Sequence, residues 1–272
     1  MKLLYLLPKN ILSRIVGWLM HQPVGVWAIR LFASVYRINI SEAEKPIEQY
    51  KSIGNFFVRR LRAGARPLGN SPLVHPADSV ISQISSIQNG QLVQAKGRLY
   101  SIQTLLDDEQ AIAKYDQGLF ATYYLCPTDY HRVHSPVQGQ ITAVSYLPGQ
   151  LWPVNEWSVN SIADLFCRNE RVVVEFSTEW GAIALVFVGA TNVGKITLSF
   201  ENQIVSNQNS AQKKKKIIYE NPLFIEKGQE LGMFHMGSTV VMCYPVTLRK
   251  QKPDHLWQEF LQKPVKMGEN FL

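Results

Sequence analysis

Apolar residues recur at helical spacing in the first part of the chain. They fall on one stripe within residues 11–20, and a second stripe follows within residues 24–35. This periodicity predicts two amphipathic helices, and Pro23 is placed to open the second. Neither stretch supplies the roughly 20 continuous apolar residues of a membrane-spanning helix.

From residue 73 onwards the pattern changes to short β-rich runs that alternate with turn residues. Many short strands favour a sheet sandwich or a barrel-like core. The predicted strands are 79–87, 91–95, 121–125, 139–146, 171–176, 182–188, 195–200, 216–219 and 239–244. Short helices are expected near 101–106 and 161–166. The predicted fold class is therefore α+β, with N-terminal amphipathic helices followed by a β-rich, sandwich or barrel-like core.

The composition adds a basic charge to this picture. The chain has 272 residues, of which 46% are hydrophobic and 18% charged, so it can bury a sizeable core. Its net charge of +7 indicates an anionic partner. No zinc-finger or RNP pattern is present, so we expect no nucleic acid and prefer an anionic membrane surface. The cysteines, Cys126, Cys167 and Cys243, are far apart, which disfavours both a disulfide framework and a structural zinc site.

All the charged side chains of the N-terminal segment are basic. Residues 1–40 contain no acidic residue, and they carry Trp18 and Trp27. Two amphipathic helices packed on the core would explain the periodicity. A basic pair lying in the membrane interface explains the tryptophans and the charge as well. We therefore predict a membrane-interface segment at 1–40 and a second domain at 41–272. The lysine run 213–216 is typical of a solvated loop, although it could also touch anionic lipid.

Candidate chemistry lies in three places. Gly237-Ser238 precedes a strand-like run, where a glycine-serine turn is the ordinary interpretation. His131 and His134 could bind a metal, but no further ligand cluster is evident, so no metal site is expected. Asp78 follows a proline and an alanine, where an aspartate commonly forms a turn. Taken singly, each of these is compatible with a structural role.

Taken together, the three stretches resemble the phosphatidylserine decarboxylase family. Residues 227–240 (KGQELGMFHMGSTV) resemble its self-cleavage site. His75-Pro76-Ala77-Asp78 and the segment 129–136 (DYHRVHSP) match two further signatures in the same order. Weaker similarity runs through 55–59, 94–97 and 188–194, so the resemblance covers nearly the whole chain.

The resemblance implies a self-processing proenzyme. Its serine, Ser238, would break the Gly237–Ser238 bond and become a pyruvoyl group, leaving a β chain 1–237 and an α chain 238–272. The family uses an Asp-His-Ser relay, which maps onto Asp78, His134 and Ser238, and a proton donor, which maps onto His131. One departure is Ser79, where the family usually has glycine after the aspartate.

The function implied is decarboxylation of phosphatidylserine to phosphatidylethanolamine. The ketone of the pyruvoyl group would act as the electron sink that pyridoxal phosphate provides elsewhere. The resemblance also implies a homodimer bound peripherally to the cytoplasmic side of the inner membrane. Two rivals remain at this point. A serine hydrolase would use the same triad, although the sequence has no G-x-S-x-G elbow. A non-enzymatic basic lipid-binding protein would explain the N-terminus alone.

Overall fold

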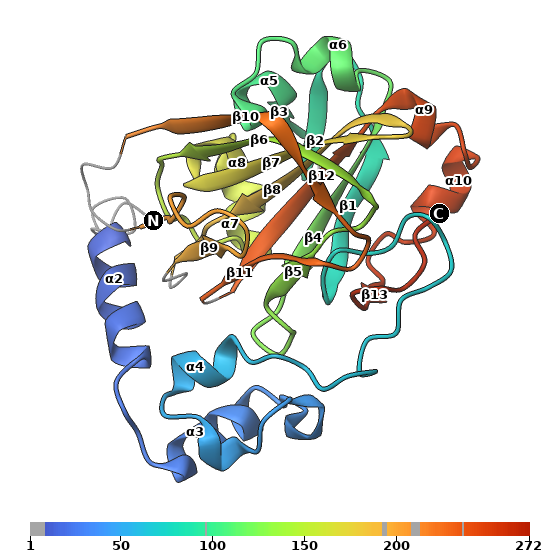
Figure 1. The fold of residues 1–272 in the computed structure, drawn as a ribbon. Coiled ribbons are helices and arrows are strands. Elements are labelled where there is room, and N and C mark those ends of the chain that lie inside the picture. Colours follow the sequence, from blue (N-terminus) through green and yellow to red (C-terminus); the bar gives the residue numbers. More distant parts are fainter. Residues whose placement is uncertain (1–8, 96, 192–194, 208–212, 236) are drawn as a thin grey trace.

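The structure is a computed structural model that describes residues 9–95, 97–191, 195–207, 213–235 and 237–272. Within these ranges, the side chains of Lys9, Asn10, Leu12 and Ser238 are not described. The N-terminal helices lie on one side of the molecule, and the rest consists of β-sheets with short helices around them (Figure 1). The polypeptide therefore divides into a small helical part and a large β-rich part.

The helices are short outside the N-terminal segment. They are α2 (Lys9–Met20), α3 (Val26–Val35), η1 (Ile40–Glu42), η2 (Ile47–Gln49), α4 (Ile53–Phe57), α5 (Ile102–Leu106), α6 (Ala111–Tyr115), α7 (Glu156–Ser161), α8 (Leu165–Arg168), α9 (Val246–Arg249) and α10 (Asp254–Gln258).

The strands form one large antiparallel sheet and two small ones. They are β1 (Ser79–Ser86), β2 (Gln91–Ala95), β3 (Arg98–Ser101), β4 (Leu119–Leu125), β5 (Arg132–His134), β6 (Gly139–Leu147), β7 (Arg171–Thr178), β8 (Gly181–Val188), β9 (Ile196–Leu198), β10 (Lys215–Ile225), β11 (Glu230–Phe234), β12 (Ser238–Tyr244) and β13 (Pro264–Val265). The large sheet has eight strands in the order β10-β6-β7-β8-β12-β4-β1-β13. The small sheets are β5-β11-β9 and β2-β3.

These elements confirm the predicted α+β class, with N-terminal helices followed by antiparallel sheets. Within the described residues the large sheet stays open, because β10 and β13 are its two edges, so the core is not a closed barrel. The helix predicted at 161–166 is wrong in detail. Asn155 caps α7 by accepting a hydrogen bond from the amide of Ser158 (3.0 Å), which starts that helix earlier. Asp164 then takes a left-handed conformation (φ 54°), which separates α7 from α8.

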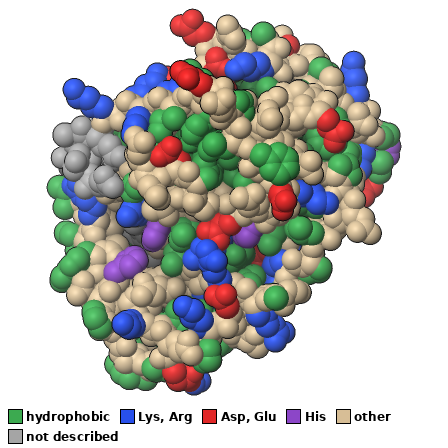
Figure 2. Space-filling model, in the orientation of Figure 1, with side chains coloured by type: hydrophobic (Ala, Val, Ile, Leu, Met, Phe, Trp, Pro, Cys, Tyr) green, Lys and Arg blue, Asp and Glu red, His purple; other side chains and the backbone are tan. Residues whose placement is uncertain are grey.

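Helix α3 and the segment that follows it form a small core of their own. Ile29 and Ala33 of α3 are buried against the segment that contains Tyr50 and Phe56. The opposite faces of α2 and α3 leave large apolar side chains in solvent; these are Ile11, Ile15, Trp18 and Leu19 on α2 and Trp27, Leu31 and Val35 on α3. Apolar and basic side chains mix along this edge of the surface (Figure 2). No helix in the described part of the chain is long and apolar enough to cross a membrane.

Backbone hydrogen bonds join the three sequence motifs. The amide of His134 donates to the carbonyl of Pro76 (2.8 Å), which ties the second motif to the first. The amide of Phe234, just before the third motif's glycine, donates to the carbonyl of His131 (3.0 Å). Strand β11 continues this contact by pairing with β5. Segments far apart in the sequence therefore meet at the start of β12.

Candidate active site

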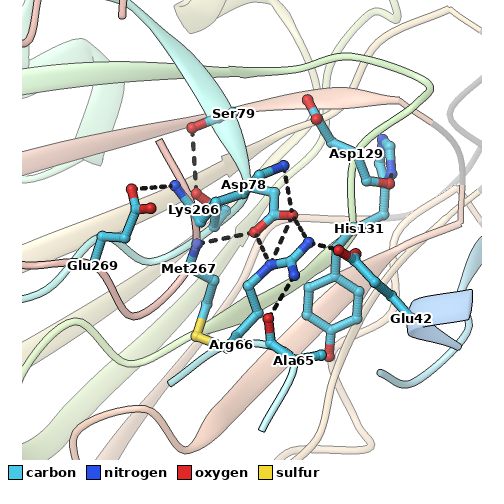
Figure 3. Close-up of polar contacts among 12 residues, drawn as sticks. Glu42, Ala65, Arg66, Asp78, Ser79, Asp129, His131, Lys266, Met267 and Glu269 are labelled. Atoms are coloured by element: carbon cyan, nitrogen blue, oxygen red, sulfur yellow. Dashed lines mark hydrogen bonds and ion pairs between the residues drawn. The ribbon is translucent and has the colours of Figure 1, made fainter. Parts of the chain in front are cut away.

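Asp78 lies at the entrance to β1 and is almost fully buried (1% exposed). Arg66 approaches it with two nitrogens, Nε at 2.9 Å from Oδ1 and Nη2 at 2.5 Å from Oδ2. The amide of Met267 donates to Oδ1 (2.9 Å), and Nζ of Lys266 lies 3.4 Å from Oδ2 (Figure 3). Burial is compensated by these charge-assisted contacts, so the carboxylate is held in one orientation.

The acidic surroundings of Asp78 extend in two directions. Glu42 accepts a hydrogen bond from Nη2 of Arg66 (2.9 Å), so this arginine bridges two carboxylates. On the other side, Figure 3 shows Asp129 and His131 near Asp78. Burial raises the pKa of Asp129, and the charge of Asp78 raises it further, although a hydrogen bond from the amide of Cys126 opposes the shift.

His131 is fully buried and has one ring nitrogen without a partner. Its Nδ1 lies 2.9 Å from the carbonyl oxygen of Asp129, which can only accept, so Nδ1 carries the proton. Its Nε2 has no hydrogen-bond partner among the described residues. The ring packs against Phe57 with a centroid distance of 4.1 Å. Burial lowers the pKa of His131 to about 3, so the ring is neutral at physiological pH and Nε2 is a free acceptor.

His134 differs because both of its ring nitrogens are engaged. Nδ1 lies 2.8 Å from the carbonyl oxygen of Gly228, and Nε2 lies 3.1 Å from the hydroxyl of Tyr130. Burial lowers the pKa of His134, so this ring is also neutral. Burial raises the pKa of Tyr130, which keeps its hydroxyl protonated and able to donate to Nε2. The described hydrogen bonds therefore connect His134 to Tyr130 and connect Asp78 to Arg66, and they do not join His134 to Asp78.

Gly237 places the backbone beside His131. A Cβ added to Gly237 would lie 3.9 Å from Nε2 of His131 and 3.8 Å from the carbonyl oxygen of Leu125. These are ordinary contact distances, so the glycine is not required by crowding. Its missing Cβ instead leaves the carbonyl carbon open to approach. Ser238 begins β12, opposite Leu125 in β4, while its side chain lies outside what the structure describes.

A pocket of about 200 Å³ opens beside Gly237. Tyr124 and Asn155 supply polar groups to its wall, and Phe32 and Tyr36 reach it from α3 and the residue after it. A larger pocket of about 610 Å³ shares Tyr124 and Asn155 and extends past Thr239. The described residues contain no group of three or more His, Cys, Asp and Glu that could hold a metal ion.

Comparison with known proteins identifies the family to which this chain belongs. The family model described as phosphatidylserine decarboxylase matches residues 53–272. The chain is 43% identical over 247 residues to the phosphatidylserine decarboxylase proenzyme of Anaeromyxobacter sp. (strain K), covering 89% of this chain and 87% of that protein. It is 42% identical over 253 residues to the corresponding proenzyme of Shewanella sp. (strain ANA-3), covering 88% and 85%.

The chain belongs to the phosphatidylserine decarboxylase family. Its function is that of a phosphatidylserine decarboxylase, a lyase of phospholipid biosynthesis. The hydrolase and the non-enzymatic lipid-binding protein are thereby set aside. Membership of this proenzyme family also implies a pyruvoyl group and a division into α and β chains.

Several groups in the site of this decarboxylase have no signal in the sequence. Arg66 and Lys266 hold Asp78, but neither stands at a spacing that indicates contact with it. Tyr130 adjoins His131 in a recognised motif, yet its contact with His134 depends on how the loop before β5 folds. His75 opens the first motif and is structural. Its ring packs against Phe271 at 4.9 Å, and burial lowers its pKa to about 3.

Proposed function

We propose that the chain cleaves itself between Gly237 and Ser238 and converts Ser238 into the pyruvoyl group of the decarboxylase. The observation that carries this proposal is the buried Nε2 of His131 beside Gly237, which has no hydrogen-bond partner among the described residues. A buried nitrogen without a partner costs stability unless another group uses it. A reacting group at residue 238 would use it.

The cleavage chemistry balances with one water consumed and one ammonia released. The Ser238 oxygen attacks the Gly237 carbonyl carbon and the amide becomes an ester. Loss of the Ser238 α-proton then expels the Gly237 carboxylate and leaves a dehydroalanine. Tautomerisation and hydrolysis give the ketone and ammonia. The products are the β chain 1–237, with a new carboxylate, and the α chain 238–272, with no free α-amine.

We assign the removal of the serine proton to His134, with Asp78 orienting and stabilising the charged imidazole. The motif supports this assignment, and the backbone bond from His134 to Pro76 supports it by holding the histidine beside the Asp78 segment. The assignment requires His134 to exchange Tyr130 for Ser238 at Nε2, and to exchange the carbonyl of Gly228 for Asp78 at Nδ1. His131 is the competing base, because its Nε2 is not bonded to any side chain or backbone group that the structure describes.

The surroundings of residue 238 fit a pyruvoyl group. Nε2 of His131 is available to it, and the pocket beside Gly237 leaves space for a substrate headgroup. The group supplies a ketone that takes up the substrate amine and accepts the electrons left when carbon dioxide departs. Neutral Nε2 of His131 accepts the proton that the substrate ammonium loses and returns it to carbon after decarboxylation.

The membrane is the proposed source of the substrate. Phe32 and Tyr36 line the pocket beside Gly237, and the neighbouring face of α3 exposes Trp27 and Leu31. A helix lying in the bilayer interface would bring phosphatidylserine directly to this pocket. We propose peripheral binding at the cytoplasmic side of the inner membrane, with residues 1–40 as the contact. A homodimer of αβ units is proposed from the family resemblance.

Intact-mass analysis of the purified protein tests self-processing. The active enzyme should contain a fragment 238–272 lighter by one ammonia than the serine-headed peptide. Ser238→Ala should remain a single inactive chain. An active preparation that contains only the uncut chain would refute the proposal.

A further inference from the structure

A second pocket, of about 290 Å³, lies on the segment that joins the N-terminal helices to the sheets. Basic and hydrogen-bonding side chains dominate its wall. Those used below are Lys45, Tyr50, Arg59, Arg60 and Arg132. We call it the Arg59 pocket.

Arg59 is the unusual member of this pocket. Its side chain is buried (4% exposed), yet Nε and Nη1 have no hydrogen-bond partner among the described residues. The ring of Phe56 lies 5.2 Å from its guanidinium carbon and supplies a cation–π contact only. Burial lowers the pKa of Arg59, although arginine remains charged. Burying two guanidinium nitrogens without hydrogen-bond partners is costly, which indicates that an anion completes the site.

The neighbouring charges leave the pocket positive, because its described lining contains Lys45, Arg59, Arg60 and Arg132 with one acidic residue, Glu44. Glu230 accepts a hydrogen bond from Nη1 of Arg132 (2.6 Å) and also lies 3.7 Å from Arg60. One carboxylate is thus shared by two arginines. Arg60 and Lys45 are exposed at the rim, where they can attract an anion from solution.

The Arg59 pocket and the pocket beside Gly237 share no lining residue among those described, although the charge of Arg59 adds to burial in lowering the pKa of His131. His131 and Arg132 are adjacent at the start of β5, and successive side chains of extended backbone point to opposite sides. Phe57 packs on His131, whereas the carbonyl of Val58 accepts a hydrogen bond from Nε of Arg132 (3.0 Å). Neither Gly237 nor His131 lines the Arg59 pocket.

We propose that the Arg59 pocket binds a phosphate-type oxyanion, either the phosphodiester of an anionic lipid headgroup or free phosphate. A tetrahedral anion carries several oxygens, so one oxygen can accept from an unpartnered nitrogen of Arg59 while others pair with Lys45 and Arg60. Tyr50 and Phe56 belong to the small core that also buries Ile29 of α3. An anion bound here would therefore lie next to the helices proposed to contact the membrane.

Thermal unfolding of the full chain in phosphate, against chloride at equal ionic strength, tests anion binding. Phosphate should raise the midpoint of the parent with increasing concentration. Arg59→Met should weaken the apparent affinity for phosphate roughly tenfold or more, because a charge-assisted pair is lost. Lys51→Met is the matched control. It removes one positive charge from an exposed position outside the pocket and should respond like the parent.

Vesicle sedimentation distinguishes the two sources of the anion. If lipid supplies it, Arg59→Met should bind phosphatidylglycerol-containing vesicles more weakly than Lys51→Met, and free phosphate should compete. If free phosphate supplies it, the two variants should bind these vesicles equally while only Arg59→Met loses the thermal response.

A variant of the two exposed rim residues provides a second test if Arg59→Met fails to fold. The double change Lys45→Gln and Arg60→Gln alters exposed side chains and should reduce the phosphate response in the same direction. The proposal is overturned if phosphate stabilises the parent, Arg59→Met and the rim variant equally and vesicle binding is also equal. A gel for the Gly237–Ser238 cut, run on the same samples, reports self-processing independently of this result.

Discussion

At the scale of single residues, the two neighbouring histidines differ in what their ring nitrogens contact. Both carry the proton on Nδ1, because each Nδ1 faces a backbone carbonyl. Nε2 of His131, beside Gly237, has no partner in the part of the chain that the structure describes, whereas Nε2 of His134 accepts a hydrogen bond from Tyr130. Only His131 is ready to accept a proton without first changing partners.

Substituting each histidine separately should separate the two proton-transfer tasks. His134→Ala and Asp78→Ala should accumulate the uncut chain, because the proposed relay then lacks its base or its support. His131→Ala should still cut, at least in part, but should release carbon dioxide about 10²–10⁴-fold more slowly. A denaturing gel measures the cut, and carbon dioxide release measures turnover. An uncut His131→Ala beside a normally cut His134→Ala would exchange the two assignments.

The sequence alone proposes Asp78, His131 and His134 as candidates, because the order of the motifs can be read without any knowledge of the fold. It could not supply their partners. Arg66 reaches Asp78 only because the chain after α4 passes beside the start of β1, and Lys266 does so only because β13 pairs with β1. Contacts of this kind depend on tertiary packing, which the local pattern does not record.

At the scale of elements, α3 presents one buried and one exposed face, and α2 exposes large apolar side chains as well. Ile29 of α3 is fully buried, whereas Trp27 is 72% exposed and Trp18 of α2 is 64% exposed. The exposed tryptophans contribute nothing evident to the small core, which packs through the other face. They are therefore available to a bilayer interface, where tryptophan is favoured.

Replacing the exposed tryptophans should weaken membrane binding without unfolding the protein. Trp18→Ser and Trp27→Ser should each reduce sedimentation with anionic vesicles roughly tenfold, because burying a large apolar side chain contributes roughly 1.5–3 kcal/mol. Trp157→Ser is the control, since Trp157 is also exposed but lies on α7. Parent-like vesicle binding by both helix variants would assign α2 and α3 a purely structural role.

Element types were more predictable than their partnerships. The strand predicted at 239–244 is β12 with one residue added, because its apolar run is long and uniform. The strands β5 and β11 were not predicted. β5 has only three residues, and β11 includes Gly232, which packs closely on the carbonyl of Thr197. Their pairing places the second and third motifs side by side. The two strands that the sequence pattern did not predict therefore position the site.

At the scale of the whole molecule, the proposed cut falls between a strand of a small sheet, β11, and a strand of the large sheet, β12. The α and β chains stay associated after the cut. Strand β11 pairs with β5 and β9, whereas β12 lies between β8 and β4 inside the large sheet. The α chain 238–272 also supplies β13 at the sheet edge. Strand β12 of the α chain is thus hydrogen-bonded on both of its sides to strands of the β chain.

The two fragments should therefore co-elute in native size-exclusion chromatography and separate only after denaturation. Refolding from urea should distinguish the cut enzyme from uncut Ser238→Ala. Recovery of the cut enzyme should fall on dilution, because two chains must meet, while recovery of the single chain should not depend on concentration. Dissociation of the fragments under native conditions would contradict this view of β12.

The contacts of Asp78 also carry a consequence for timing. Its carboxylate is held by Arg66, which precedes the Gly237–Ser238 bond, and by Lys266 and Met267, which follow it. A nascent chain acquires the last two partners only after the scissile bond has already been synthesised. Under the proposed role of Asp78, irreversible cutting must wait until those later residues have left the ribosome and folded back onto β1. A nascent chain that still lacks Lys266 and Met267 would therefore not cleave itself.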